Sequence, residues 1–366
     1  MPSLNGVLTS EQVALTASAI AAVQEPSGAI PWFAGGHTDV WDHVESAMAL
    51  TAAGHQNEAA RAYRWMLDTQ RTDGSWPIGI DQGSVTDGGS DANFCAYFAT
   101  GIWHRWLVTA DYSALAQAWP AVKAAMGFVV ALQRPRGEIV WARGAGGIPV
   151  RTALLSSSSS IYLSLRCGLA LAELMRELQP DWELAAGLLG HALSLHPESF
   201  EDRDRFSMDW YYPVLAGPLA GGTALARLEQ RWEDFVVPGL GVRCVDDRPW
   251  VTGAETCELA LALDVVGDRD RALTMLSSMQ HLREDSGAYW TGYVYADDAR
   301  WPVEQSSWTA AAVILAVDAL SNSTAGAGVF RGEGLPQVKD VVGEHCGCIS
   351  GDRVASPALH SLQNTK

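Results

Sequence analysis

The sequence has few basic residues and no long apolar run. A membrane-spanning helix needs about 20 predominantly apolar residues, and the cleanest apolar run here, residues 310–317, ends at Asp318. Lys and Arg number 25 against 42 Asp and Glu, which gives a net charge of −17. Nucleic acids and anionic membrane surfaces repel such a chain, so we expect neither a nucleic-acid partner nor an integral membrane segment.

Cysteine and targeting signals are also sparse. Six irregularly spaced Cys in 366 residues do not match the framework of a disulfide-stabilised secreted domain. The N-terminus has no basic segment ahead of an apolar core, and Glu11 lies where that core would be, so we expect no signal peptide. The sequence therefore predicts a cytoplasmic protein with reduced thiols.

Strand-like alternation is almost absent, whereas helical periodicity runs through most of the chain. An apolar content of 48% is enough for a large core. The pattern predicts twelve helices, at residues 9–23, 38–53, 56–70, 90–108, 112–133, 156–177, 181–196, 206–217, 219–234, 252–266, 268–282 and 303–320. Gly54, Pro197, Gly267 and the pair at 238–239 act as breakers between them.

The predicted helices are of two alternating kinds. Those starting near residues 38, 90, 156, 206, 252 and 303 are apolar on nearly every side, and the others carry charge on one face. A helix that is apolar all round is buried, and an amphipathic one lies at the surface. Six inner and six outer helices, with 9–23 outside the last, predict an all-α fold: a single (α/α)6 toroid over residues 1–321, followed by an irregular tail at 322–366.

An internal repeat supports the ring over the alternative of an irregular helical domain. Each copy has a Gln at the end of an outer helix, then a Gly, then a bulky apolar residue. The copies are Gln70, Gly74 and Trp76; Gln133, Gly137 and Ile139; and, after an insertion, Gln280, Gly287 and Trp290. The Gln can hydrogen-bond terminal backbone groups and the Gly can take a positive φ, so we expect the first copy to be structural.

The first copy, from Arg61 to Trp76, resembles the QW repeat of squalene-hopene and oxidosqualene cyclases, with Met66 in the usual Leu place. The chain is similar over about residues 9–320 to the terpenoid-cyclase and protein-prenyltransferase toroid superfamily. The resemblance implies a terpenoid-cyclase-like or prenyltransferase-like enzyme with a general acid in an aromatic cavity. The Asp-x-Asp-Asp acid of class II cyclases is absent, and the length allows only one toroid.

In an α/α ring the N-termini of the inner helices meet at one end, here called the mouth. The sequence at these N-termini is rich in carboxyl and aromatic groups. The candidate catalytic residues are Asp209, Glu304, Glu255 and Asp42. The candidate substrate-binding residues are His37, Asp39, Trp41, His43, Glu45, Asp91, Tyr162, Trp210, Tyr211, Glu258 and Trp308.

Helix capping explains part of this pattern, because Asp and Ser cap N-termini and carboxylates favour the positive end of the helix dipole. Capping does not explain the carboxyl groups that are followed by largely apolar helix, since burying a carboxyl is costly. We expect Asp209, Glu255 and Glu304 to share one pocket. Asp209 is the leading acid, because Met208 and the aromatic residues after it would desolvate the carboxyl and raise its pKa.

Three functions fit these residues. The leading hypothesis is a terpenoid-cyclase-like enzyme, in which aromatic faces stabilise a carbocation. The first alternative is a glycoside hydrolase of the α/α barrel type, in which two carboxyl groups flank the bond and aromatic rings stack on sugars. The second alternative is a toroid that only binds a partner, with separated and exposed carboxyl groups. The substrate, isoprenoid or sugar, and the oligomeric state stay open.

The motifs at the mouth predict no cofactor and no metal. Acidic loops at residues 81–87, 246–247 and 297–298 could hold Mg²⁺ against a diphosphate, although solvated loops in an acidic protein are the simpler interpretation. His345, Cys346 and Cys348 form one compact thiol cluster with no visible fourth zinc ligand, so its role stays open.

Overall fold

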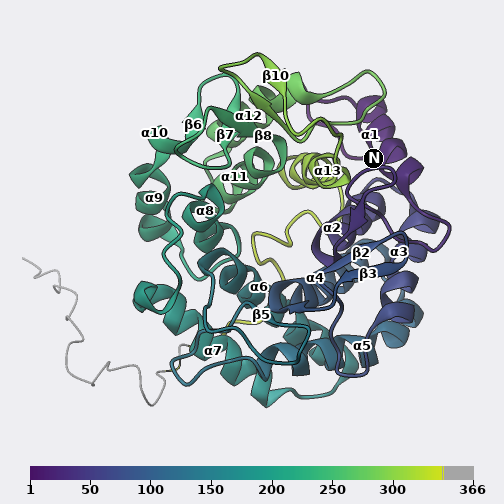
Figure 1. Cartoon of the computed structure of the whole chain (residues 1–366), viewed down its shortest axis with the longest axis vertical. Helices are drawn as coiled ribbons and strands as arrows, with labels where there is room; N and C mark the ends of the chain where they lie inside the picture. The colour runs from purple at the N-terminus through teal and green to yellow at the C-terminus, as the bar shows by residue number, and fades with distance from the viewer. Residues whose placement is uncertain (340, 342–366) are drawn as a thin grey trace, which may run out of the picture.

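The computed structural model describes residues 1–339 and 341, and six inner helices inside six outer ones carry the fold (Figure 1). The inner helices are α2 (Val40–Ala52), α4 (Ala92–Thr109), α6 (Leu155–Met175), α8 (Ser207–Leu215), α11 (Gly253–Val265) and α13 (Ser307–Ser321). The outer helices are α1 (Ser10–Val23), α3 (Gln56–Thr69), α5 (Tyr112–Val130), α7 (Pro180–Leu195), α9 (Gly221–Gln230) and α12 (Arg269–Ser278). The predicted (α/α)6 toroid is confirmed.

The inner helices form a closed ring. Each packs against its two neighbours in the order α2, α4, α6, α8, α11, α13, and α13 packs on α2. Each outer helix covers the inner helix before it in the chain, except that α1 covers α13, as the sequence predicts. Every residue of α13 except Ser321 is buried, whereas α3 buries only one apolar face. Among the described residues, no helix is both long and apolar enough to cross a membrane.

Two predicted helices differ from the observed ones. The segment 219–234 is interrupted at Arg231, which leaves α9 and a single-turn helix, α10 (Trp232–Phe235). The last inner helix begins at Ser307 and not near residue 303, because the Ser306 side chain accepts a hydrogen bond from Thr309 N and caps the helix. Glu304 therefore precedes α13 and belongs to the loop before it.

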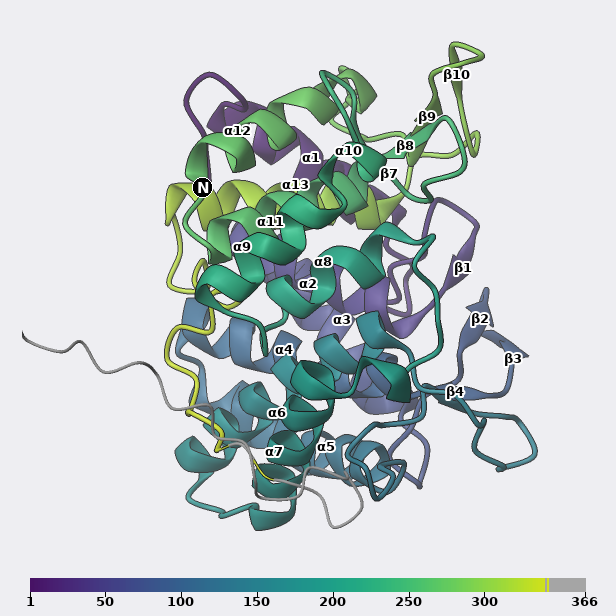
Figure 2. The same ribbon diagram turned by 90° about the vertical axis from the view of Figure 1, so that its left-hand side faces the viewer.

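Short antiparallel strands are the feature that the sequence analysis missed. They are β1 (His37–Thr38), β2 (Gly79–Asp81), β3 (Ser84–Asp87), β4 (Ser90–Asp91), β5 (Ala142–Arg143), β6 (Val236–Val237), β7 (Gly241–Arg243), β8 (Trp250–Thr252), β9 (Gly292–Val294) and β10 (Ala299–Arg300). Strands of two to four residues are too short for an alternating pattern to be visible. They lie in connections that lead into inner helices, so they gather at the mouth, on the right of Figure 2.

A repeated hydrogen-bonded turn ties the outer helices α1, α3 and α5 each to the next outer helix. Gln70, which follows α3, donates from Nε2 to Gly74 O and to Ala121 O of α5, both at 2.9 Å. The expected hydrogen-bonding role of this Gln is therefore confirmed. Gly74 has φ +88°, and a Cβ there would lie 2.1 Å from Ala124 O of α5, so only glycine fits.

Further copies of the turn extend around the ring. The same pair of bonds occurs at Gln133, to Gly137 and Ala185 of α7, and at Gln24, to Gly28 and Glu58 of α3. The copy at Gln24 escaped the sequence analysis because the small Ala19 lies where the other copies have the bulky Trp65, Phe128 and Met275. At Gly287, with φ +90°, an added Cβ would meet the backbone of Leu15 in α1 at 2.5 Å. This turn packs the end of the chain's last outer helix against the first.

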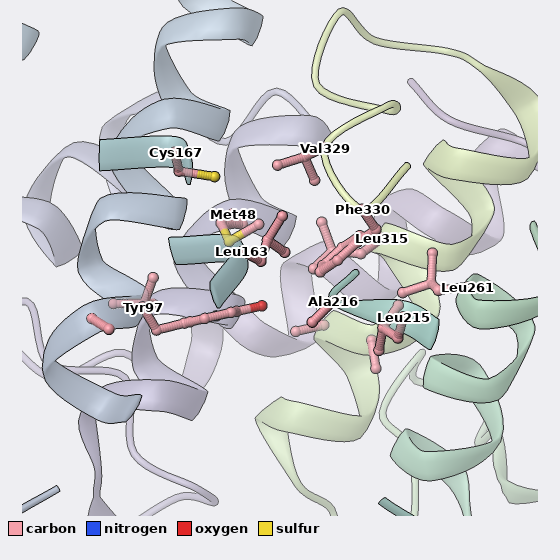
Figure 3. Packing of buried hydrophobic residues seen from close by; sticks show 14 of the residues in the cluster. Met48, Tyr97, Leu163, Cys167, Leu215, Ala216, Leu261, Leu315, Val329 and Phe330 are labelled. Carbon is pink, nitrogen blue, oxygen red and sulfur yellow. The ribbon is translucent and has the colours of Figure 1, made fainter. Parts of the chain in front are cut away.

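The end of the ring opposite the mouth is filled with apolar side chains. Residues 322–339 form an irregular segment after α13 that passes across this end (Figures 1 and 2). Val329 and Phe330 are buried in the same hydrophobic cluster as Met48, Leu261 and Leu315 (Figure 3). The interior of the ring is thus apolar at this end, and polar groups concentrate towards the mouth.

Trp76 tests the structural role of the repeat. Its ring is 1% exposed, its Nε1 donates to Met66 O at 3.0 Å, and it packs on Phe98. We expect Trp76→Ala to lower the free energy of unfolding by about 3–5 kcal/mol, measured by urea denaturation, without a selective change in KM. Trp76→Phe, which keeps most of the ring, should lose less. Normal stability with lost activity would reverse the assignment.

Candidate active site

Four polar side chains occupy equivalent positions on four inner helices. Glu45, Tyr97, Tyr212 and Glu258 are each the sixth residue of α2, α4, α8 and α11 respectively. All four are buried, and we call them the carboxyl–tyrosine layer. In Figure 3 the Tyr97 ring extends from its helix towards the middle of the ring. Helices that start at the same end bring equal positions to the same depth, which is why residues so distant in sequence meet.

Glu258 is held by two tyrosines on one helix. Tyr212 Oη donates to Glu258 Oε1 at 2.6 Å, and Tyr211 Oη donates to Oε2. Burial raises the pKa of Glu258 well above its ordinary value, and the charge of Glu45 adds to the rise. The two hydroxyl donors act in the opposite direction, because they stabilise the charged carboxylate.

Glu45 lies beside Glu258 in the same layer. Burial raises the pKa of Glu45 to about 8, and the charge of Asp39 contributes to the shift. The polar edges of the Trp308, Tyr97 and Trp41 side chains surround the carboxyl group and partly oppose the rise. A carboxyl of this kind is protonated at neutral pH unless a cation or a change of environment stabilises its charge.

Asp42 lies one helical turn closer to the mouth than Glu45. Burial raises the pKa of Asp42 well above its ordinary value, and the carboxyl groups of Asp39, Glu45 and Glu258 all add to the rise. Asp39, the N-cap of α2, accepts a hydrogen bond from Asp42 N at 2.9 Å. Asp91, which caps α4, has its pKa raised to about 7, mainly by burial, and the charge of Asp39 adds to the rise. Because their negative charges repel one another, some of these crowded carboxyl groups are expected to stay protonated.

Aromatic rings flank the carboxyl groups on two sides. Trp41 packs against Tyr97 and Tyr212, with ring centroids 5.9 and 5.8 Å apart. Trp308 packs on Trp32 at 5.5 Å, and Trp32 stacks on His37 at 5.6 Å. The structure therefore brings together most of the predicted mouth residues: Asp39, Asp42, Glu45, Glu258, Tyr211, Trp41 and Trp308, with Asp91, His37 and Glu255 next to them.

Asp209 has the raised pKa that the sequence analysis expects, and burial is its main cause. Its Oδ1 accepts a hydrogen bond from Ser156 N at 3.1 Å, so it caps the neighbouring helix α6. The positive charges of Arg203 and Arg227 lower its pKa, and no mouth carboxyl group is among its principal electrostatic neighbours. The catalytic role of Asp209 stays a prediction, with capping as the role that its contacts describe.

The expected shared pocket of Asp209, Glu255 and Glu304 is a point to correct, because the three carboxyl groups have separate partners. Glu255 lies one helical turn closer to the mouth than Glu258, beside Cys244 and Thr252. Glu304 Oε1 accepts from Trp32 Nε1 at 2.7 Å in the loop before α13. The loop position of Glu304 follows from the late start of α13, and its carboxyl group is held by Trp32 and Thr291.

Three candidate binding residues face away from the carboxyl groups. His43 bridges Ile30 N and Ala62 O through its two ring nitrogens at 3.0 Å each, and burial lowers its pKa to about 4. Trp210 stacks on Phe235 of α10, and its Nε1 donates to Arg227 O of α9. Tyr162 packs against Gly190 of α7. Helical rotation places these side chains between inner and outer helices, so we remove them from the substrate-binding set.

The sequence analysis missed Tyr97, Tyr212 and Trp32. Tyr97 and Tyr212 share their helical position with Glu45 and Glu258, but the shared position appears only when it is counted from the observed helix starts. Trp32 precedes the first inner helix and carries no such signal.

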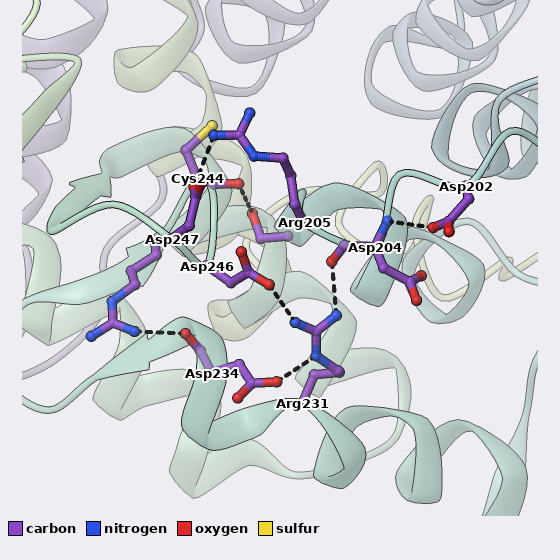
Figure 4. A network of polar contacts seen from close by, with 10 residues as sticks. Asp202, Asp204, Arg205, Arg231, Asp234, Cys244, Asp246 and Asp247 are labelled. Atoms are coloured by element: carbon purple, nitrogen blue, oxygen red, sulfur yellow. Dashed lines mark hydrogen bonds and ion pairs between the residues drawn. The ribbon is translucent and has the colours of Figure 1, made fainter.

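The acidic loop at residues 246–247 is paired with arginines. Arg231 pairs with Asp246 at 2.7 Å and Arg205 pairs with Asp247 at 2.8 Å (Figure 4). These ion pairs remove the main argument for Mg²⁺ at that loop. Over residues 1–339 and 341, no group of three or more His, Cys, Asp or Glu is arranged to hold a metal ion. His345, Cys346 and Cys348 lie outside the described residues.

Glu45→Gln tests the protonation of the buried layer. Folded Glu45 keeps its proton up to about pH 8, whereas an unfolded Glu releases it near its ordinary value of 4.5. Between these values the native state holds more protons than the unfolded state, so its stability falls as the pH rises. We expect the variant to gain stability over the wild type from pH 4.5 to pH 8 in urea unfolding. The exposed Glu183→Gln is the control, and a constant difference would contradict the assignment.

Several solved enzymes that act on sugars share the α/α toroid fold of this chain. A solved glycosidase in complex with glucose matches with a TM-score of 0.67 at 13% identity, over 87% of this chain and 100% of that one. A mannosylglycerate hydrolase of Thermus thermophilus, also with glucose, gives 0.65 at 15% identity, over 82% and 99%. A D-mannose isomerase gives 0.64 at 12% identity, over 85% and 96%. At these identities the likeness shows the fold.

The sequence relationship is closer. No family model matches the chain. It is 58% identical over 354 residues to the MMP endo-(1,4)-3-O-methyl-alpha-D-mannosidase of Mycolicibacterium hassiacum, covering 96% of this chain and 98% of that protein. The chain belongs to the family of this glycosidase.

This membership corrects the leading hypothesis of the sequence analysis. The protein is an enzyme of the glycosidase kind, and neither a terpenoid cyclase nor a prenyltransferase. Its substrate is a small molecule of the sugar class, and the isoprenoid is unsupported. The repeat is a real turn of the toroid, but it does not identify the cyclase family, because any α/α ring has to join successive outer helices.

Proposed function

We propose that the protein hydrolyses internal (1,4) linkages between 3-O-methyl-α-D-mannosyl units. The observation that carries the proposal is the group of buried carboxyls at the mouth, formed by Asp42, Glu45 and Glu258 with aromatic rings on both sides. Glycoside hydrolysis needs one carboxyl group to donate a proton and a second one as a carboxylate. The substrate is taken from the M. hassiacum relative.

Asp42 is the proposed general acid and Glu258 the proposed base. The three carboxyl groups around Asp42 all favour its protonated form. Glu258 has two tyrosine hydroxyl donors, which favour negative charge on its oxygens. Since neighbouring carboxyls resist charging together, the charge concentrates on the member with the most donors, which is Glu258.

The reaction then follows from these states. Asp42 donates its proton to the glycosidic oxygen while the bond between that oxygen and C1 breaks. Glu258 takes a proton from a water molecule whose oxygen forms the new bond to C1. Trp41 and Trp308 offer faces on which sugar rings can pack, and the aromatic walls stabilise the positive charge that develops at C1.

The free thiols of Cys95, Cys167, Cys244 and Cys257 support a reducing compartment, the cytoplasm.

Asp42→Asn and Glu258→Gln test the assignment. We expect each to lower kcat by about 10²-fold or more on a (1,4)-linked 3-O-methyl-α-mannan oligosaccharide, because a positioned acid or base contributes that much. Asp209→Asn is the matched comparison, since Asn can still accept the hydrogen bond from Ser156 N. We expect it to keep kcat within about 10-fold of the wild type. Thermal unfolding checks that the variants fold.

A different pattern would assign the chemistry elsewhere. Full turnover in Asp42→Asn, together with a large loss of kcat in Asp209→Asn, would assign the general acid to Asp209 of α8. Cleavage of the oligosaccharide only at its ends would contradict the internal mode of attack.

A further inference from the structure

A cavity lies at the mouth end of the toroid, to one side of the inner ring. It has a volume of about 260 Å³ and lies between α1, the N-terminus of α13 and the loop before α13. The outer helices run opposite to the inner ones, so the end of α1, where Ile20 and Val23 lie, is at the mouth end of the toroid. Val303, which is 82% exposed, forms part of the rim. The cavity can therefore receive a group from a chain that crosses the mouth.

The walls of this cavity are apolar except at one side. Ile20, Val23, Phe33 and Val303 supply apolar surface. Glu304 and Gln305 supply the polar groups. Hydrogen bonds from Trp32 Nε1 and Thr291 Oγ1 both end on Glu304 Oε1, which leaves Oε2 to accept from a bound hydroxyl.

Trp32 connects the cavity to the carboxyl groups. Its Nε1 holds Glu304, and its ring packs on Trp308 at 5.5 Å. Trp308 in turn lies against the carboxyl group of Glu45. The cavity and the proposed reaction centre thus lie on two sides of one aromatic wall.

We infer that this cavity is a subsite for a 3-O-methylhexosyl unit of the substrate, next to the unit that is cleaved. The inference rests on the proposed function. An O-methylated sugar presents both an apolar methyl group and hydroxyl groups, and the cavity offers apolar walls with a carboxylate and an amide on one side. Burial of the methyl group against Ile20 and Val23 is the source of selectivity, and Glu304 orients the ring through a hydroxyl.

The subsite gives a measurable preference for methylated chains. A single methyl group in an apolar pocket changes kcat/KM by about 10- to 200-fold. We expect the wild type to prefer a (1,4)-linked 3-O-methyl-α-mannan oligosaccharide over the unmethylated chain of equal length by at least about 10-fold.

Ala34→Trp fills the cavity from an exposed turn, so it can be tested without disturbing the core. We expect it to raise KM for the methylated chain by about 10-fold or more, with kcat nearly unchanged, and to remove the preference for methylation. Leu184→Trp adds the same side chain at an exposed site on α7 and is the control. Val303→Asp, on the exposed rim, is a second variant with the same expected result. Glu304→Gln should raise KM for both chains.

A binding measurement separates this inference from the proposed function. Saturation-transfer NMR measures the binding of methyl 3-O-methyl-α-D-mannoside to the wild type and to Ala34→Trp. If the wild type cleaves neither chain, the proposed function is wrong. The subsite is still supported in that case if the wild type binds the mannoside in the NMR experiment and Ala34→Trp does not. If the wild type cleaves the methylated chain but both cavity variants keep its preference and the NMR binding, the subsite is overturned.

Discussion

Closure of the inner ring is the constraint on which the rest of this structure depends. Because α13 packs on α2, six helices that are far apart in sequence start at one end and point the same way. The Gln–Gly turns hold the outer helices at the spacing that this closure needs, and at Gly74 and Gly287 the backbones meet so closely that no side chain fits. Convergence of the helix starts then concentrates carboxyl groups in a small buried volume.

That concentration creates the chemistry. A carboxyl at a single helix start would be a cap, as Asp209 is for α6 and Asp91 is for α4. At the sixth position of α2 and α11 the same group is buried among other carboxyls, and its pKa rises because both burial and like charge disfavour ionisation. Tyr211 and Tyr212 break the equivalence by donating to Glu258 alone. An acid and a base can thus arise from chemically similar groups.

The apolar far end and the polar mouth give this chemistry its direction. Val329 and Phe330 join the apolar cluster at the far end, so polar ligands meet favourable partners only towards the mouth. The strands that the sequence analysis missed build the rim there, and the loop before α13 carries Glu304 to the side of the ring. A carbohydrate chain that lies across such a rim contacts several elements at once, which suits cleavage within a chain.

The sequence by itself determined the toroid, since helical periodicity and the alternation of apolar and amphipathic segments depend only on local residue order. It also determined that carboxyl and aromatic groups gather at the mouth. It did not determine which of them face inward, because one residue of helical rotation turns a side chain by about 100° and separates Tyr211 and Tyr212 from Trp210. The Gln–Gly turn resembled a cyclase signature because it serves the ring and not the reaction. Only the tertiary structure decided which carboxyls meet, since their distances and pKa shifts arise from contacts between helices about 200 residues apart.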